Sequence, residues 1–101
     1  MNNFNYKQLD EIIHSRIRLA IMASLISVES ATFVFLKEQV NTTDGNLSIH
    51  LKKLVEVKYI SINKKFVKNK PLTTIKLTIK GKTAFMEYIN KLEKMINLES
   101  K

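Results

Sequence analysis

The chain has 101 residues, of which 45% are hydrophobic. This is enough for one small domain with its own core, and too apolar for a disordered basic tail. The absence of cysteine excludes a disulfide framework, a thiolate zinc site and a cysteine nucleophile. We also expect no membrane segment and no signal peptide, because no apolar run approaches about 18 residues and the N-terminus lacks an apolar stretch. These features predict a single cytoplasmic domain over residues 1–101.

The net charge of +8 is concentrated in one part of the sequence. Residues 1–60 carry a net charge of +1 and residues 84–101 a net charge of zero. The stretch from 61 to 83 has no acidic residue and seven lysines, namely Lys64, Lys65, Lys68, Lys70, Lys76, Lys80 and Lys82. A local patch of this density attracts polyanions, so it indicates a nucleic-acid partner.

The first forty residues predict two helices and a short strand. Apolar residues with a 3.6-residue period predict a helix over 8–28, with a possible break where Ser15 can cap a new start. A short strand is expected over 31–33. A second helix is expected over 35–40, ended by Asn41, a residue type that tolerates the left-handed conformation.

The most informative helix is predicted over about 43–57. Thr43 is a good N-cap, and Asp44 brings a negative charge to the first turn, where the helix dipole favours it. Helical spacing then places one apolar stripe on the buried side, formed by Leu47, Leu51 and Leu54. The opposite side is formed by Gly45, Ile49, Lys52, Lys53 and Glu56, with Asn46 and Ser48 flanking it.

The remainder predicts a hairpin followed by a helix. Strict alternation indicates half-buried strands over 60–64 and 73–78, joined by a turn over 66–72 that contains Asn69 and Pro71. The C-terminal helix is expected over about 79–98. Together these elements predict an α+β fold, mainly α: a winged helix-turn-helix with a two- to three-stranded antiparallel sheet, a wing over about 61–78 and a C-terminal dimerisation helix.

The chain resembles small stand-alone winged-helix transcriptional regulators of bacteria and archaea, related in fold to the MarR and ArsR groups. The likeness covers about residues 9–92. It rests on the segments IHSRIRLAIMASL (13–25), DGNLSIHLKKL (44–54), KKFVKNKPLTT (64–74) and LTIKGKTAFMEY (77–88). The resemblance implies a homodimer that binds DNA near promoters, with the helix from Asp44 in the major groove and the 64–74 hairpin as the wing. One departure is Lys58, which stands where such proteins usually have Gly.

Two interpretations compete for the polar side of the 43–57 helix. One is an ordinary solvated face. The other is a surface that reads DNA. Ile49 favours this second interpretation, because it is an apolar residue on the polar side and an apolar side chain can contact a thymine methyl. Asn46 favours it as well, because Asn can pair with adenine. The wing lysines fit phosphate contacts. The candidate DNA-binding residues are Thr43, Asp44, Gly45, Asn46, Ser48, Ile49, Lys52, Lys53, Lys64, Lys65, Lys68, Asn69, Lys70, Thr73 and Thr74.

The sequence offers no constellation for catalysis or for metal binding. Only two histidines are present, His14 and His50, and neither has a nearby acidic cluster. Asp10 and Glu11 are adjacent, so on a helix they point to different sides and do not form an acid–base pair. We therefore expect no enzymatic activity, no metal and no cofactor. For His50 we expect half-buried packing or a phosphate contact.

An apolar strip near the C-terminus predicts self-association. Most of the globular part is complete by Tyr88, which leaves later apolar residues with little of their own chain to cover. The candidate dimer-interface residues are Ile12, Ile13, Phe85, Ile89, Leu92, Met95 and Ile96. Leu98 extends the strip, and the apolar face of residues 4–13 accompanies it.

The predicted function is that of a homodimeric, sequence-specific regulator bound to a pseudo-palindromic double-stranded DNA operator. A repressor is favoured over an activator, because the 101 residues show no separate activating or sensing domain. The alternative is a winged helix used as a protein-interaction or RNA-binding module, which would more often have an apolar or acidic third helix. The operator, and whether a small molecule controls release from DNA, stay open.

Overall fold

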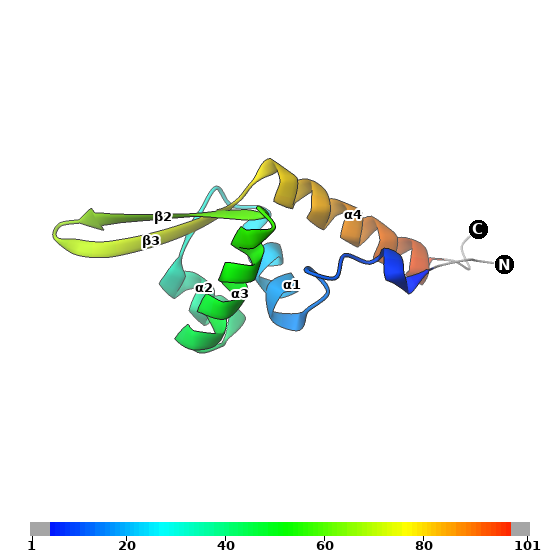
Figure 1. Cartoon of the computed structure of the whole chain (residues 1–101), viewed down its shortest axis with the longest axis horizontal. Coiled ribbons are helices and arrows are strands. Elements are labelled where there is room, and N and C mark those ends of the chain that lie inside the picture. Colours follow the sequence, from blue (N-terminus) through cyan, green and yellow to red (C-terminus); the bar gives the residue numbers. More distant parts are fainter. Residues whose placement is uncertain (1–4, 98–101) are drawn as a thin grey trace.

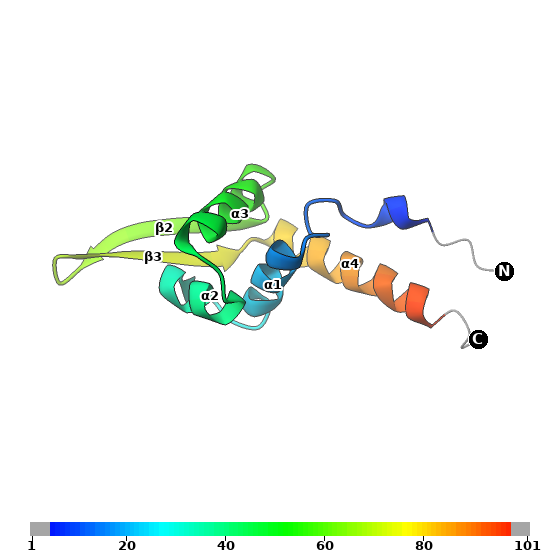
Figure 2. The ribbon, with the colours of Figure 1, turned by 90° about the horizontal axis from the view of Figure 1, so that it is seen from below.

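The computed structural model describes residues 5–97. The molecule is elongated, with extents of 60 × 25 × 22 Å. Four α-helices, one 3-10 helix and a three-stranded antiparallel sheet make up this part of the chain. The β2–β3 hairpin projects from one end of the helical body, and α4 projects from the other end (Figures 1 and 2). Within the described residues, no helix combines the length and apolar character that a membrane crossing requires.

The N-terminal segment differs from its predicted helix. A 3-10 helix, η1 (Tyr6–Gln8), is followed by turns, and α1 spans only Arg16–Leu25. The reason lies at Asp10, whose Oδ1 accepts hydrogen bonds from the backbone N–H groups of Ile12 and Ile13, at 2.8 and 3.2 Å. Such local bonds compete with helical ones, so the apolar period continues without a helix. The predicted helix over 8–28 was therefore wrong outside α1, whereas the cap at Ser15 is confirmed.

The next two elements begin close to the predicted positions. Strand β1 is Ala31–Thr32, and α2 spans Phe33–Val40, two residues earlier than expected. Thr32 sets this start, since its hydroxyl oxygen accepts from the Phe35 N–H at 3.0 Å and caps the helix. Asn41 ends the helix in the left-handed region with φ of 59°, as predicted.

Helix α3 (Asp44–Glu56) begins as predicted, and a lysine occupies the left-handed position that follows its last turn. The Thr43 hydroxyl accepts from the Asn46 N–H at 3.1 Å. At the other end, Lys58 adopts a φ of 65°, while its N–H bonds to the Val55 carbonyl and the Tyr59 N–H bonds to the Leu54 carbonyl. This pair of bonds is a Schellman motif, which normally has Gly in the left-handed position. Lys58 therefore fills the role of Gly in the same geometry.

The wing is a longer and tighter hairpin than the sequence indicated. Strands β2 (Ile60–Val67) and β3 (Lys70–Leu77) are joined by only two residues, Lys68 and Asn69. Both have positive φ, 52° and 65°, as a type I′ turn requires. Sheet order is β1-β3-β2.

The predicted turn over 66–72 was too wide, because Pro71 lies inside β3 opposite Phe66. In a two-residue hairpin the pair next to the turn exchanges hydrogen bonds, so the following pair, Phe66 and Pro71, does not. The nitrogen of Pro71 faces away from β2, and β1 pairs with β3 only at Thr74 and Ile75. A missing N–H at this position therefore breaks no ladder bond.

The predicted half-burial of the two strands holds for only one of them. In β3, Ile75 and Leu77 are buried and Leu72, Thr73 and Thr74 are half-buried. In β2 only Ile60 is buried, and the rest of the strand is exposed because the hairpin extends beyond the helices (Figure 1). The alternation of apolar and polar residues in β2 correctly predicted a strand, but the half-burial predicted from it was wrong.

Helix α4 (Ile79–Ile96) packs closely on the base of the wing. Thr78 caps it, accepting from the Gly81 N–H at 2.9 Å. A Cβ at Gly81 would collide with the carbonyl group of Tyr59, so this crossing requires a glycine. The predicted end of this helix near residue 98, including Leu98, lies outside the described residues.

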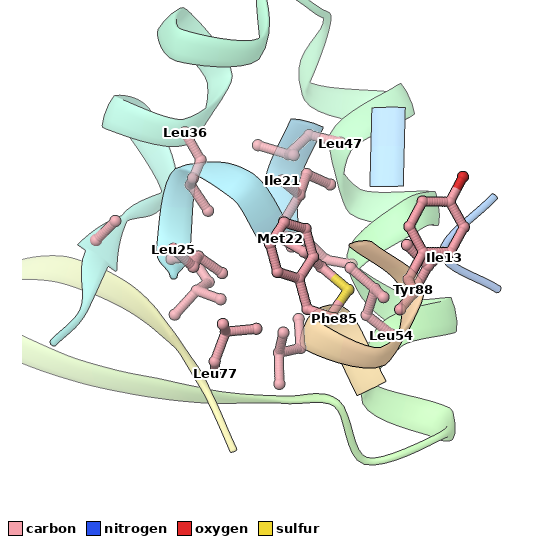
Figure 3. Close-up of a cluster of buried hydrophobic side chains, with 14 residues drawn as sticks. Ile13, Ile21, Met22, Leu25, Leu36, Leu47, Leu54, Leu77, Phe85 and Tyr88 are labelled. Atoms are coloured by element: carbon pink, nitrogen blue, oxygen red, sulfur yellow. The ribbon is translucent and has the colours of Figure 1, made fainter. Parts of the chain in front are cut away.

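The core joins all the helices to the base of the sheet. Figure 3 shows side chains from α1, α3 and α4 directed toward one another around Met22. The predicted stripe of α3 is confirmed, since Leu47, Leu51 and Leu54 are all buried. The other residues of this core are Ile13, Ile21, Met22, Leu25, Ala31, Leu36, Ile60, Ile75, Leu77, Phe85 and Tyr88. The packing fixes α3 so that its polar side faces outward, beside the wing.

Candidate nucleic-acid interface

The outer face of α3 presents short polar, apolar and cationic side chains without a carboxylate in its middle. Ile49 is 56% exposed although it is apolar. The other exposed candidates of this face are Gly45, Asn46, Ser48, Lys52 and Lys53. Amide, hydroxyl and branched apolar groups are the chemistry that reads base edges, and the two lysines suit phosphate.

Two of the candidate residues have a structural role at the start of α3. The hydroxyl oxygen of Thr43 is occupied as the helix cap. Asp44 forms an ion pair with Lys37 of α2, with 2.9 Å between Oδ1 and Nζ. Both side chains of this pair are partly exposed, so its contribution to stability is small. The ion pair nevertheless reduces the negative potential at the N-terminal end of α3.

The wing carries its cations at the tip and along both faces. Side chains alternate along a strand, so the register places Lys64 and Thr73 on one face and Lys65, Lys70 and Thr74 on the other. The candidate wing residues that are exposed are Lys64, Lys65, Lys68, Asn69 and Lys70. Thr73 and Thr74 are half-buried near the base of the hairpin. The tip is therefore the most accessible cationic part.

A hollow of about 470 Å³ separates the outer part of α3 from the base of the wing. Its lining includes Ser48 and Lys52 of α3, and Lys64 and Thr73 of the wing. Apolar side chains form the remaining lining: Phe33, Leu51, Val55 and Ile62. Candidate residues from the two predicted elements thus line one concave surface, which has the Lys64 face of the wing on one side.

His50 lies at the edge of α3 and packs against α1. Its Nδ1 is 2.9 Å from the Nη1 of Arg18, and Arg18 Nε donates to the Ile12 carbonyl. Burial lowers the pKa of His50 from its usual 6.5, and the charges of Arg18 and Lys53 lower it further. The imidazole is therefore neutral at pH 7 and accepts from the guanidinium. The half-buried packing expected for His50 is confirmed.

A pH dependence of stability follows from this pKa. The unfolded chain binds a proton at His50 more readily than the folded one, so the free energy of unfolding should fall as the pH drops below about 6.5. His50→Gln lacks this contribution. We expect the stability difference between the native chain and His50→Gln, measured by urea unfolding, to be larger at pH 7.5 than at pH 5. An equal difference at both values would contradict the assignment.

Polar groups near the N-terminus connect that segment to the body. The Tyr59 hydroxyl donates to Asp10 Oδ2 at 2.5 Å, and burial together with this bond raises the pKa of Tyr59 to about 12. His14 Nδ1 is 2.7 Å from the Tyr88 hydroxyl, and Lys91 Nζ donates to the Gln8 carbonyl at 3.1 Å. These contacts hold the N-terminal segment against α4. Among residues 5–97, no three His, Asp or Glu side chains are grouped so as to hold a metal ion.

The candidate dimer-interface residues divide into two groups. Ile13 and Phe85 lie in the core of their own chain, 0% and 7% exposed, so they have no surface left for a partner. Ile12, Ile89 and Leu92 are half-buried. Met95 and Ile96 are 41% and 73% exposed on the outer part of α4. The strip that remains available is therefore more distal than the predicted one.

The sequence interpretation missed Phe66, which is 76% exposed near the tip of the wing. It was assigned to the turn, because Pro71 was read as a turn residue. Arg18 was missed as well, and no local pattern pointed to its contact with His50 on α3. One sequence signal could have placed Phe66 correctly. Asn favours the positive φ of hairpin turns, so Lys68-Asn69 could have been taken as a two-residue turn, with Phe66 and Val67 in the strand before it.

Comparison with known proteins agrees with this architecture. The family profile of a winged helix DNA-binding domain matches residues 17–96. An uncharacterized protein of Methanocaldococcus jannaschii is 44% identical over 79 residues, which cover 78% of this chain and 86% of that protein. The chain therefore belongs to the winged helix DNA-binding domain family.

Solved structures show the same fold. A transcriptional regulator homologue from Pyrococcus horikoshii has a TM-score of 0.81 at 24% identity and covers 87% of each chain. The putative transcriptional regulator ytfH from Salmonella typhimurium has a TM-score of 0.71 at 17% identity, over 89% of this chain and 80% of that one. These structures confirm the predicted winged-helix fold. The family match supports DNA binding as the general class of activity.

Proposed function

We propose that this protein is a homodimeric, sequence-specific regulator of transcription that binds double-stranded DNA and acts as a repressor. The observation that carries the proposal is the concave surface between α3 and the wing. Ser48 and Lys52 of α3 line one side of it, and Lys64 and Thr73 of the cationic hairpin line the other. Asn46 and Ile49 are exposed on the first turns of the same helix. The exposed lysines of the wing have no carboxylate among the residues from 61 to 83 to neutralise them.

In this proposal α3 enters the major groove with its N-terminal turns foremost. Asn46, Ser48 and Ile49 lie on those turns and are exposed. The first turns of a recognition helix are the part that reaches base edges. Lys52 and Lys53, one turn further on, approach the phosphates that border the groove. The half-site is then read by a small number of side chains from a single helix.

The wing follows the DNA backbone toward the neighbouring minor groove. Lys64 faces the same hollow as α3, while Lys68 and Lys70 lie at the tip. Phosphate contacts of this kind position a protein on the duplex without reading its sequence. In this proposal α3 therefore reads the DNA sequence, and the wing holds the protein on the DNA backbone.

Dimerisation is proposed through the outer half of α4 and the N-terminal segment. The outer half of α4 lies at the end of the molecule opposite the wing (Figure 2). Its residues Leu92, Met95 and Ile96 leave apolar surface there. Two copies joined there in a two-fold arrangement would present two recognition helices to a pseudo-palindromic operator. Repression requires only that the dimer occupy its site, so DNA-binding and dimer surfaces are sufficient for it.

Two substitutions test the division between reading and anchoring. Asn46→Ala should weaken binding to a selected operator by about 1–3 kcal/mol and should affect a scrambled duplex much less. Lys68→Ala should weaken binding to both duplexes by similar factors, because it removes a phosphate contact. The operator is obtained by selecting random duplexes on the purified protein, and affinities are measured at one fixed salt concentration.

The two substitutions control for each other, since both replace an exposed side chain. If Asn46→Ala reduced affinity equally on operator and scrambled DNA, α3 would not read sequence. The absence of any enriched sequence in the selection would oppose sequence-specific binding altogether.

A further inference from the structure

Phe66 is an aromatic side chain that the fold leaves uncovered. It is 76% exposed, one residue from the turn of the hairpin, and it follows directly on Lys64 and Lys65. Leaving a phenylalanine in water forgoes the stabilisation that its burial would give. Phe66 lies within a strongly cationic hairpin. A partner that suits this surface is anionic, to match the lysines, and has an apolar site that can accept the aromatic ring.

The register shows which way Phe66 points. Phe66, Lys64 and Ile62 alternate onto the same face of β2, opposite Pro71, Thr73 and Ile75 of β3. Lys64, Ile62 and Thr73 line the hollow that α3 borders. The ring of Phe66 therefore continues the face of the wing that looks toward α3, and the neighbouring Val67 lies on the other face.

The distance along the wing is of the same order as the spacing of DNA grooves. Four residues of a strand separate Ile62, beside α3, from Phe66, a length of about 13 Å. Half a turn of B-DNA, which separates a major groove from the adjacent minor groove, is about 17 Å. With α3 in the major groove, the wing would carry Phe66 toward the next minor groove, and Lys64 and Lys68 would lie near the phosphates on either side.

We propose that Phe66 inserts into the minor groove as an apolar wedge, partly unstacks a base step and bends the operator. This inference rests on the proposed function and adds a specificity element to it. Apolar wedges of this kind open flexible steps such as TA, so they select DNA by its deformability as well as by its base edges. The flanking cations Lys64 and Lys68 keep the hairpin against the backbone while the ring enters.

The test compares Phe66→Ala with Val67→Ala, an apolar residue of the same strand on the opposite face. Phe66→Ala should weaken operator binding by about 5- to 150-fold, the range that corresponds to the loss of one aromatic contact with a base. The dependence of affinity on salt should stay unchanged, because no charge is removed. Val67→Ala should bind like the native protein, and Phe66→Leu should retain much of the affinity, since leucine is also a wedge residue.

A second readout reports the wedge itself. Energy transfer between dyes at the two ends of the operator should show a bend of about 20–90° with the native protein and a smaller bend with Phe66→Ala. 2-Aminopurine at the step beneath the wing tip should brighten only with the native protein and Phe66→Leu. Thermal unfolding of each variant verifies that the hairpin is intact.

Each negative outcome has a distinct meaning. Equal affinity and equal bending by the native protein and Phe66→Ala would overturn the wedge, while DNA binding by the native protein would stand. Equal losses from Phe66→Ala and Val67→Ala would assign Phe66 to the stability of the hairpin through its pairing with Pro71. A native protein with no affinity for DNA would refute the proposed function and the wedge together.

Discussion

Gly81→Ala should lower the free energy of unfolding by about 2–4 kcal/mol. The added methyl group would collide with the backbone carbonyl of Tyr59, which also accepts a hydrogen bond from the Thr78 N–H. A side-chain rotation cannot relieve this collision, because the atoms of Tyr59 that the methyl group would meet belong to the backbone. The start of α4 must therefore move away from the base of the wing. Urea unfolding followed by circular dichroism measures the loss.

Gly45→Ala is the matched control, because this glycine lies in α3 with nothing within 4 Å of an added Cβ. Alanine is the better helix former, so this variant should gain about 0.5–1 kcal/mol. Opposite signs for the same chemical change would identify the close crossing at Gly81 as the cause. Equal stability of Gly81→Ala and the native chain would show that α4 does not approach Tyr59 as described.

A chain with both Leu92→Glu and Ile96→Glu should be monomeric at tens of micromolar, where the native chain is expected to be a dimer. Two carboxylates from each subunit would then meet in an apolar seam, where unpaired charge is strongly unfavourable. Loss of the dimer should also remove the gain in operator affinity that two joined recognition helices provide. Analytical ultracentrifugation reports the first effect and operator binding the second.

Ile79→Glu is the control for this variant, since Ile79 is 84% exposed on the same helix but at its other end. It should leave the dimer intact. Ile96→Glu alone separates association from folding, because Ile96 is largely exposed whereas Leu92 is half-buried. A native chain that sediments as a monomer at tens of micromolar would contradict the proposed interface.

Local signals in the sequence were sufficient for most of the fold. Thr43 and Ser15 cap helices as predicted, because a cap depends on the side chain and on the few residues after it. The stripe of Leu47, Leu51 and Leu54 is buried as predicted, because helical spacing fixes which side an apolar residue occupies.

The errors arose where a local competitor or the length of an element decided the outcome. The side chain of Asp10 captures two backbone N–H groups and prevents a helix that the apolar period favours. Pro71 was assigned to the turn together with Asn69, because proline is a common turn residue. Its nitrogen faces away from β2 in the hairpin, so a proline at this position costs no ladder hydrogen bond. Neither effect is visible in periodicity.

The candidate site was predictable in composition and only partly in geometry. The exposed residues of α3 followed from the helical period, and the wing lysines followed from the charge pattern. Phe66 could not be placed, because its direction depends on a register that the turn sets. Ile13 and Phe85 were expected at a subunit interface, since sequence alone does not show how much of the N-terminal segment and of α4 the body of the same chain covers.

The dependence of DNA affinity on salt tests the central claim most directly. A dimer that places lysines of both wings and both α3 helices against phosphates should neutralise about 6–10 charges. The logarithm of the binding constant plotted against the logarithm of salt concentration should then have a slope of roughly −5 to −9. A slope shallower than about −2 would contradict the account, because the lysine patch would not face nucleic acid.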